Sequence, residues 1–99
     1  MVIKCGRLVA VVNFRILERQ LKSVANSKRL QILQQLKMHG AMSVTEVSRT
    51  VRLSRKATSK HLHILEEAGL LKRHKRGLYV IYRLSLRQAA PLKQVVGLL

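Results

Sequence analysis

The 99-residue sequence has few acidic, aromatic and cysteine residues. Only four Asp and Glu oppose 20 Lys and Arg, which gives a formal net charge of +16. One Phe, two Tyr and no Trp leave a core of aliphatic side chains, which favours packed helices over stacked sheets. The 47% of apolar residues suffice for one modest core. We therefore expect a single, mainly helical domain over residues 1–99, with residues 1–12 as a poorly ordered extension.

The residues that the sequence lacks also argue against a disulfide-bonded, exported, membrane-spanning or catalytic protein. The single cysteine, Cys5, cannot close an internal disulfide, which suits a reducing compartment such as the cytoplasm. The apolar run from Leu8 to Val12 is too short for a signal peptide, and no apolar run reaches the roughly 20 residues of a membrane-spanning helix. The sequence shows no paired carboxylates, activated nucleophile or phosphate-binding loop, so we expect neither enzyme activity nor a cofactor.

The positive charge indicates a polyanionic partner. So many like charges repel one another, and neutralisation by a polyanion relieves that repulsion. Nucleic acid is the first partner that we expect. An anionic membrane surface is a weaker alternative, because it requires an apolar face that the fold leaves unburied. The sequence contains no repeat and no flexible linker, so helix caps and apolar periodicity must define its elements.

Capping residues predict two helices in the first half of the chain. Asn13 can cap a helix that runs to about Ser23. Either Asn26 or Ser27 can cap a second, amphipathic helix, which Gly40 ends. We expect these helices to supply much of the core.

Two shorter helices follow across a turn of about three residues. Ser43 and Glu46 have the spacing of a capping box, which predicts a short helix after Ser43. Ser54 can cap a fourth helix that continues to Ala68, and Gly69 suits a left-handed C-cap. After Gly69 the helical periodicity ends.

Alternating apolar residues then predict a hairpin. Residues 71–75 and 79–84 form its strands, joined at Arg76-Gly77. Residues 85–99 again look helical, although Pro91 prevents one unbroken helix. The order α-α-α-α-β-β-α, with two short helices across a tight turn and a basic hairpin, predicts an α+β winged helix-turn-helix fold. Residues 55–68 are then the recognition helix and residues 71–84 the wing.

From Leu21 to Leu84 the chain resembles the ArsR/SmtB-like winged-helix repressors. LKSVANSKRLQILQQL resembles their second helix, LSRKATSKHLHILEEAGLL their recognition helix and RGLYVIYRL their wing. The most specific match is Ser-x-His-Leu-x-x-Leu-x-x-Ala-Gly-Leu from Ser59 to Leu70, followed by Gly77. The resemblance implies a homodimeric transcriptional regulator whose first and last helices form the dimer interface.

The ends of the chain contain apolar residues that suit such an interface. They are more than a small core needs, although completion of a monomer core stays open as an alternative. These residues are Phe14, Leu17, Leu21, Leu92, Val95, Val96, Leu98 and Leu99.

The sequence lacks the residues with which members of the resembled family sense metals or redox changes. Residues 43–52 contain no Cys, and residues 86–99 contain no Asp, Glu, His or Cys. We therefore expect no metal at the usual family sites. Cys5 alone cannot form the cysteine pair of redox sensors within one chain, so an intermolecular disulfide and an idle thiol both stay open.

His61 and His63 cannot bind one ion together, because residues two apart on a helix point about 200° from each other. We expect His61 to be partly buried and hydrogen-bonded, and His63 to lie on the open side.

The polar strip of the recognition helix lies opposite its predicted core face of Thr58, Leu62 and Leu65. Four further cations extend this basic surface more loosely: Lys28, Arg29, Arg49 and Arg52, of which Arg29 equally suits a structural hydrogen bond. Glu66 and Glu67 are expected to pair with Lys or Arg, for example from the hairpin. The predicted DNA-binding residues are Arg55, Lys56, Ser59, Lys60, His63, Arg73, Lys75 and Arg76.

The leading hypothesis is a sequence-specific regulator of double-stranded DNA, acting as a homodimeric repressor. A nonspecific structural protein of the nucleoid or of RNA is the main alternative, because +16 in 99 residues is typical of that class. A winged-helix module that binds an acidic protein is a third hypothesis. Specificity for a palindromic duplex separates the first from the second.

Overall fold

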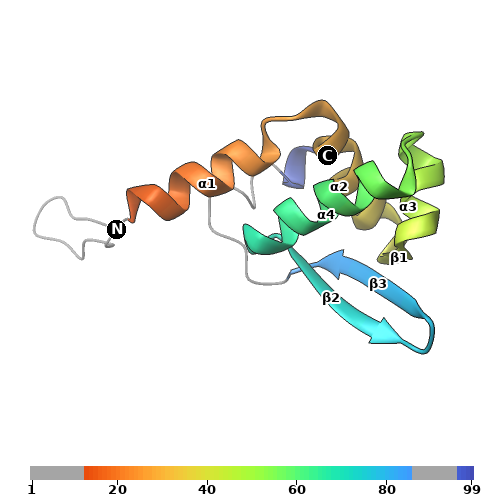
Figure 1. Cartoon of the computed structure of the whole chain (residues 1–99). Helices are drawn as coiled ribbons and strands as arrows, with labels where there is room; N and C mark the ends of the chain where they lie inside the picture. The colour runs from red at the N-terminus through yellow and green to blue at the C-terminus, as the bar shows by residue number, and fades with distance from the viewer. Residues whose placement is uncertain (1–12, 86–95) are drawn as a thin grey trace, which may run out of the picture.

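The computed structural model describes residues 13–85 and 96–99, and the chain runs through helices and a small sheet (Figure 1). The predicted N-terminal extension, Cys5 and the region around Pro91 lie outside the described residues. The predicted α+β architecture is confirmed, with one additional strand, and residues 96–98 of the predicted C-terminal helix are helical. In chain order the elements are α1 (Phe14–Val24), α2 (Ser27–His39), β1 (Ala41–Ser43), α3 (Val44–Val51), α4 (Arg55–Glu67), β2 (Leu71–Arg76) and β3 (Tyr79–Leu84).

The helices begin at the predicted caps. Asn13 Oδ1 accepts hydrogen bonds from the amides of Arg15 and Ile16. Asn26, rather than Ser27, caps α2, since its Oδ1 accepts from the amides of Lys28 and Arg29. These bonds satisfy amides that have no partner within their own helix. Local sequence therefore fixes where both helices start.

The predicted capping box of α3 is present. Ser43 Oγ accepts from the Glu46 amide at 3.2 Å, and Glu46 Oε1 accepts from the Ser43 amide at 2.8 Å. The bond from the Ser43 amide, followed by that from its hydroxyl, lowers the pKa of Glu46. The box stabilises the carboxylate that closes the first turn of α3.

The recognition helix α4 ends at the predicted glycine. Gly69 has φ +84, its amide donates to the carbonyl of Glu66, and the Leu70 amide donates to the carbonyl of Leu65. This pair of bonds is a Schellman motif, with Ala68 as the C-cap. The helix thus ends one residue before the predicted Ala68, and the chain turns directly into β2.

The sheet is antiparallel, in the order β1-β3-β2. The predicted hairpin is confirmed, although β2 is one residue longer than expected, so Gly77 and Leu78 form the turn between the paired Arg76 and Tyr79. Gly77 has φ +62, which favours glycine. Strand β1, which was not predicted, has only three residues and is too short to show alternation.

The core is mainly aliphatic, as the composition predicts, and α2 contacts α1, α3, α4, β1 and β3. The predicted inner face of α4 is buried: Thr58, Leu62 and Leu65 are each 0% exposed. No helix among residues 13–85 and 96–99 is both long enough and apolar enough to cross a bilayer. The largest fully buried side chains are Ile32, Leu33, Leu36, Val47, Val51, Thr58, Leu62, Leu65 and Leu70.

Candidate nucleic-acid interface

The burial of its inner face fixes how α4 is oriented. Because Thr58, Leu62 and Leu65 point into the core, the polar strip of the helix points outward. All eight residues predicted to bind DNA are exposed: Arg55, Lys56, Ser59, Lys60 and His63 on α4, and Arg73, Lys75 and Arg76 on β2.

The beginning of α4 lies near the tip of the wing. Arg55, the first residue of α4, lines a hollow of about 110 Å³ together with Leu78, Tyr79 and Val80 of the wing and residues 43–45. In Figure 1, α4 runs from its green start beside α3 to its teal end beside the beginning of β2. The basic start of α4 and the wing tip therefore lie at one end of the molecule, where a single ligand can contact both.

The other end of α4 is tied to the rest of the fold. Glu66 pairs with Arg73 of β2 at 3.5 Å, as predicted, whereas Glu67 pairs with His63 at 3.5 Å instead of with a Lys or Arg. Gln20 Nε2 donates to the carbonyl of Ala68 at 3.3 Å. The contacts of Glu66 and Ala68 hold the C-terminal end of α4 against the wing and α1, whereas the pair of His63 and Glu67 lies within α4.

Arg73 is consequently less free than the other predicted DNA-binding residues. Besides Glu66, it contacts Tyr82, the residue opposite it on β3. Burial raises the pKa of the Tyr82 hydroxyl, Glu66 adds to this shift and Arg73 opposes it. Arg73 thus joins the recognition helix to the wing.

Two of the loosely assigned cations have structural partners. Lys28 Nζ donates to the carbonyl of Val51, the last residue of α3, at 2.8 Å. Arg29 donates from Nε to the carbonyl of Ser23 at 2.6 Å, and from Nη2 to that of Lys22 at 3.4 Å. Arg49 and Arg52 are exposed. The structural role foreseen for Arg29 is confirmed.

His61 is partly buried and hydrogen-bonded, as predicted. Its Nδ1 lies 3.1 Å from Arg29 Nη1, and the ring accepts this bond because a guanidinium can only donate. Burial, followed by the charge of Arg29, lowers the pKa of His61. The neutral ring therefore links α2 to α4, while His63 lies on the exposed side.

Sequence reasoning missed the apolar wing tip. Leu78 is 97% exposed and Tyr79 65% exposed, directly beside Arg76. A leucine in a two-residue hairpin turn, where polar residues are usual, was the signal that could have revealed it. Within residues 13–85 and 96–99, no three His, Cys, Asp or Glu side chains gather closely enough to hold a metal ion.

A helix-turn-helix domain model matches residues 24–74, which is more than half of the chain. The transcriptional activator HlyU of Vibrio cholerae is 43% identical over 65 residues, covering 66% of this chain and 59% of HlyU. The transcriptional repressor PagR of Bacillus anthracis is 32% identical over 65 residues, covering 66% of this chain and 65% of PagR. The matches thus span less than two thirds of either relative. Both relatives are regulators, which supports the prediction that the chain is not an enzyme.

Solved structures share the fold across most of the chain. The structure of HlyU from Vibrio cholerae is 35% identical with a TM-score of 0.74, covering 90% of this chain and 92% of HlyU. A homodimeric winged helix-turn-helix DNA-binding domain from Mycobacterium bovis, described as a possible ArsR-family regulator, is 25% identical with a TM-score of 0.74, covering 86% of this chain and 75% of that one. The chain belongs to the helix-turn-helix domain family and, within it, to the ArsR/SmtB-like winged helix-turn-helix regulators.

Proposed function

We propose that this chain is a sequence-specific, double-stranded DNA-binding transcriptional regulator that acts as a homodimeric repressor in the cytoplasm. One observation carries the proposal: the cations at the start of α4 are exposed beside a basic wing. The buried face of α4 directs these cations outward. A helix start also has free amides and a partial positive charge, which favour phosphate.

The recognition helix supplies the groups that contact bases. Arg55 and Lys56 are suited to guanine edges in the major groove, and Ser59 and Lys60 to a base or the adjacent backbone. His63 lies further along the same strip and pairs with Glu67, so its contribution is smaller. We assign sequence discrimination mainly to the first two turns of α4.

The wing supplies contacts to the flanking backbone. Lys75 and Arg76 are exposed and reach phosphates, whereas Arg73 contributes less because Glu66 already neutralises it. The exposed Leu78 and its neighbour Tyr79 suit the floor of a minor groove, where apolar side chains can pack against the base edges or wedge between base steps.

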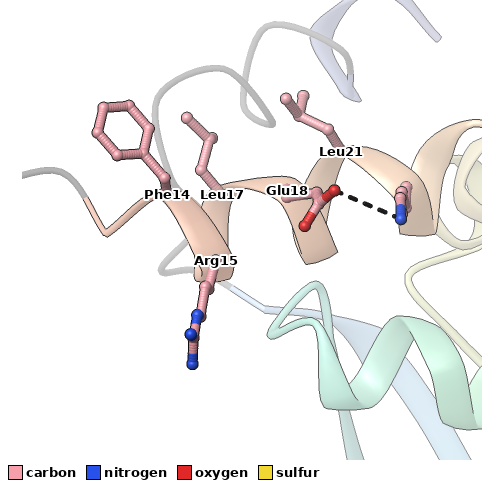
Figure 2. Close-up of a pocket in the computed structure, with 6 residues that line it drawn as sticks. Phe14, Arg15, Leu17, Glu18 and Leu21 are labelled. Carbon is pink, nitrogen blue, oxygen red and sulfur yellow. Dashed lines mark ion pairs between the residues drawn. The ribbon is translucent and has the colours of Figure 1, made fainter.

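The exposed face of α1 supports dimerisation. Phe14 is 77% and Leu21 44% exposed, and Figure 2 shows both on the same side of the helix as Leu17. This face lines a hollow of about 460 Å³ together with the charged Arg15, Glu18 and Lys22. At the other end of the chain, Leu98 is 86% exposed, whereas Val96 is buried and Leu99 packs against the core, so these two residues help to complete the core of the monomer. Covering the exposed apolar side chains by a second copy removes them from water.

The C-terminal residues lie against α2. Lys37 Nζ donates to the carbonyls of Val96 and Gly97 at 3.1 and 3.2 Å, and Gln34 Nε2 donates to that of Leu99 at 3.3 Å. These bonds fix the end of the chain, so a dimer built on it gives the two α4 helices a defined separation. The homodimeric Mycobacterium bovis domain supports this arrangement.

Selection of duplex sites from a random pool tests the proposal. We expect an enriched palindrome whose half-sites lie one helical turn apart, roughly 34–36 Å. Affinity for the selected site at physiological salt should exceed that for random duplex by at least about 1,000-fold. Equal affinity for both would overturn the proposal in favour of the nonspecific structural protein.

A promoter reporter tests the direction of regulation. With the selected site placed over the promoter, we expect the intact chain to lower transcription. A rise in transcription would show an activator, which is what HlyU is called, and would leave the DNA-binding part of the proposal intact.

A further inference from the structure

A second basic surface lies away from the start of α4. A groove of about 490 Å³, which we name the α1–α4 groove, runs between α1, the beginning of α2 and the second half of α4. In Figure 1, α1 lies beside the teal half of α4. The residues that line the groove are Arg15, Glu18, Arg19, Lys22, Ser23, Arg29 and Ile64.

Positive charge dominates the lining of this groove. Arg15, Arg19 and Lys22 recur at the spacing that puts them on one side of α1, and Figure 2 shows Arg15 pointing away from the side of Phe14 and Leu17. The one lining carboxylate, Glu18, is neutralised by Lys22 at 3.4 Å. The remaining arginines have no acidic partner among the described residues.

Arg29 gives the groove a fixed cationic group. Its guanidinium donates to the carbonyls of Ser23 and Lys22 and to the ring of His61. A guanidinium carries five N–H groups, so N–H groups remain after these three bonds, and the side chain lines the groove. Because its position is already fixed, Arg29 loses little conformational entropy when it binds an anion.

The α4 side of the groove is apolar. Ile64 is 40% exposed and lines the groove opposite the arginines. We propose that the α1–α4 groove binds a small organic anion, with a carboxylate or phosphate head beside Arg15, Arg19 and Arg29 and an aliphatic body against Ile64. An aliphatic body gains from burial, which inorganic ions and DNA backbone cannot match.

Such a ligand contacts the recognition helix at two points. Ile64 belongs to α4, and Arg29 holds His61 of α4. An anion that binds Arg29 in its fixed position and packs against Ile64 favours the present position of α4 relative to α2. By linkage, DNA then changes the affinity of the anion by the same factor as the anion changes that of DNA. This consequence rests on the proposed function, whereas binding of the anion does not.

Binding is tested with hexyl phosphate and hexanoate on the full chain, by calorimetry and by NMR of the Ile64 methyl and His61 ring signals. We expect saturable binding of one probe per chain with shifts of both signals. Inorganic phosphate, which lacks the aliphatic body, should bind at least about tenfold more weakly, and hexylammonium, which lacks the anion, should not bind. Hexyl phosphate and hexanoate together show which anionic head the groove prefers.

Matched variants localise the site. Arg19→Gln should weaken hexyl phosphate about tenfold, and Ile64→Asn should weaken it while leaving inorganic phosphate unchanged. Arg83→Gln, which removes the same charge from an exposed position of β3, should have no effect. Each variant is first checked by thermal unfolding. Equal losses for Arg19→Gln and Arg83→Gln, or binding without saturation, would overturn the site in favour of general charge attraction.

A DNA titration separates this proposal from the proposed function. Bound hexyl phosphate should change the affinity for the selected duplex at least fivefold in the wild type, and not in Arg19→Gln. If Arg19→Gln instead weakens DNA binding and probe binding is absent, the groove is part of the DNA footprint and the anion site is wrong. If the probe binds as expected but no duplex is selected, the proposed function fails and the anion site stands.

Discussion

The helices α2 and α4 both have 13 residues and both have two cations in the first turn, yet these cations have different roles. In α2, Lys28, Arg29 and Lys37 all donate to carbonyl groups of other segments. In α4, the side chains of Arg55, Lys56 and Lys60 make no hydrogen bond or ion pair within the described part of the chain. The cations therefore form two groups. Those of α2 hold segments of the chain together, and those of α4 are free to bind a ligand.

The largest effect is expected from the free cations of α4. Replacing Arg55 and Lys60 together by Ala should lower affinity for the selected duplex by about 100-fold or more, and reduce the slope of log affinity against log salt by about 2. The free energy of unfolding should stay within about 0.5 kcal/mol of the wild type, because both side chains are exposed. Fluorescence anisotropy at several salt concentrations and urea unfolding give the two quantities.

The matched control for this double variant lies on α3. Arg49→Ala and Arg52→Gly together remove the same charge from exposed positions, and glycine suits the positive φ of 58 at Arg52. A smaller loss of affinity is expected from this pair. If both double variants lose affinity equally, total charge rather than the α4 strip determines DNA binding.

The second prediction concerns stability, which should depend on a cation of α2 and not on a cation of α4. Arg29→Gln should lower the free energy of unfolding by about 2 kcal/mol, because the carbonyl of Ser23 and the His61 ring lose their donor. Arg55→Gln, the same substitution at the start of α4, should leave it unchanged. Urea unfolding of both variants checks this. An equally stable Arg29→Gln would mean that solvent replaces these bonds without cost.

The third prediction compares the second residue of each helix. Lys28→Met should lower the free energy of unfolding by about 1 kcal/mol, since the carbonyl at the end of α3 loses a charged donor. Lys56→Met makes the same change at an exposed position and should lower DNA affinity instead. If the two variants have the same effects in urea unfolding and in anisotropy, α2 and α4 do not divide their cations as described.

Local chemistry explains what was predictable. The caps Asn13 and Ser54, the box of Ser43 and Glu46, and the end of α4 at Gly69 each depend on residues within one helical turn. A single sequence contains all the information that such interactions need. The inner face of α4 followed from helical periodicity in the same way, and with it the outward direction of the polar strip.

Features that depend on distant residues were harder to predict. β1 exists because residues 41–43 pair with β3, far along the chain, and three residues show no period of their own. That Lys28 reaches the end of α3 needs the packing of α2 against α3. The α1–α4 groove is likewise assembled from three helices. The positions of Lys and Arg in the sequence therefore could not distinguish structural cations from cations that are free to bind a ligand.

The last and smallest prediction concerns His61, where α2 and α4 meet through the Arg29 bond. The pKa of His61 is lowered from 6.5 by burial and by Arg29, so the unfolded chain binds a proton at a pH where the folded chain does not. The free energy of unfolding should therefore fall as the pH decreases through about 6.5, and stop falling from this cause below the folded pKa. The effect is small because solvent reaches the half-buried ring.

His61→Gln isolates this proton. The glutamine Oε1 can still accept from Arg29, but the side chain does not titrate, so the variant should lose less stability than the wild type as the pH falls through 6.5. His63→Gln, two residues along on the exposed side, should keep the wild-type loss. Urea unfolding at several pH values measures all three proteins. If His61→Gln and His63→Gln give the same pH dependence, the neutral ring of His61 is not what joins the structural cation of α2 to the recognition helix.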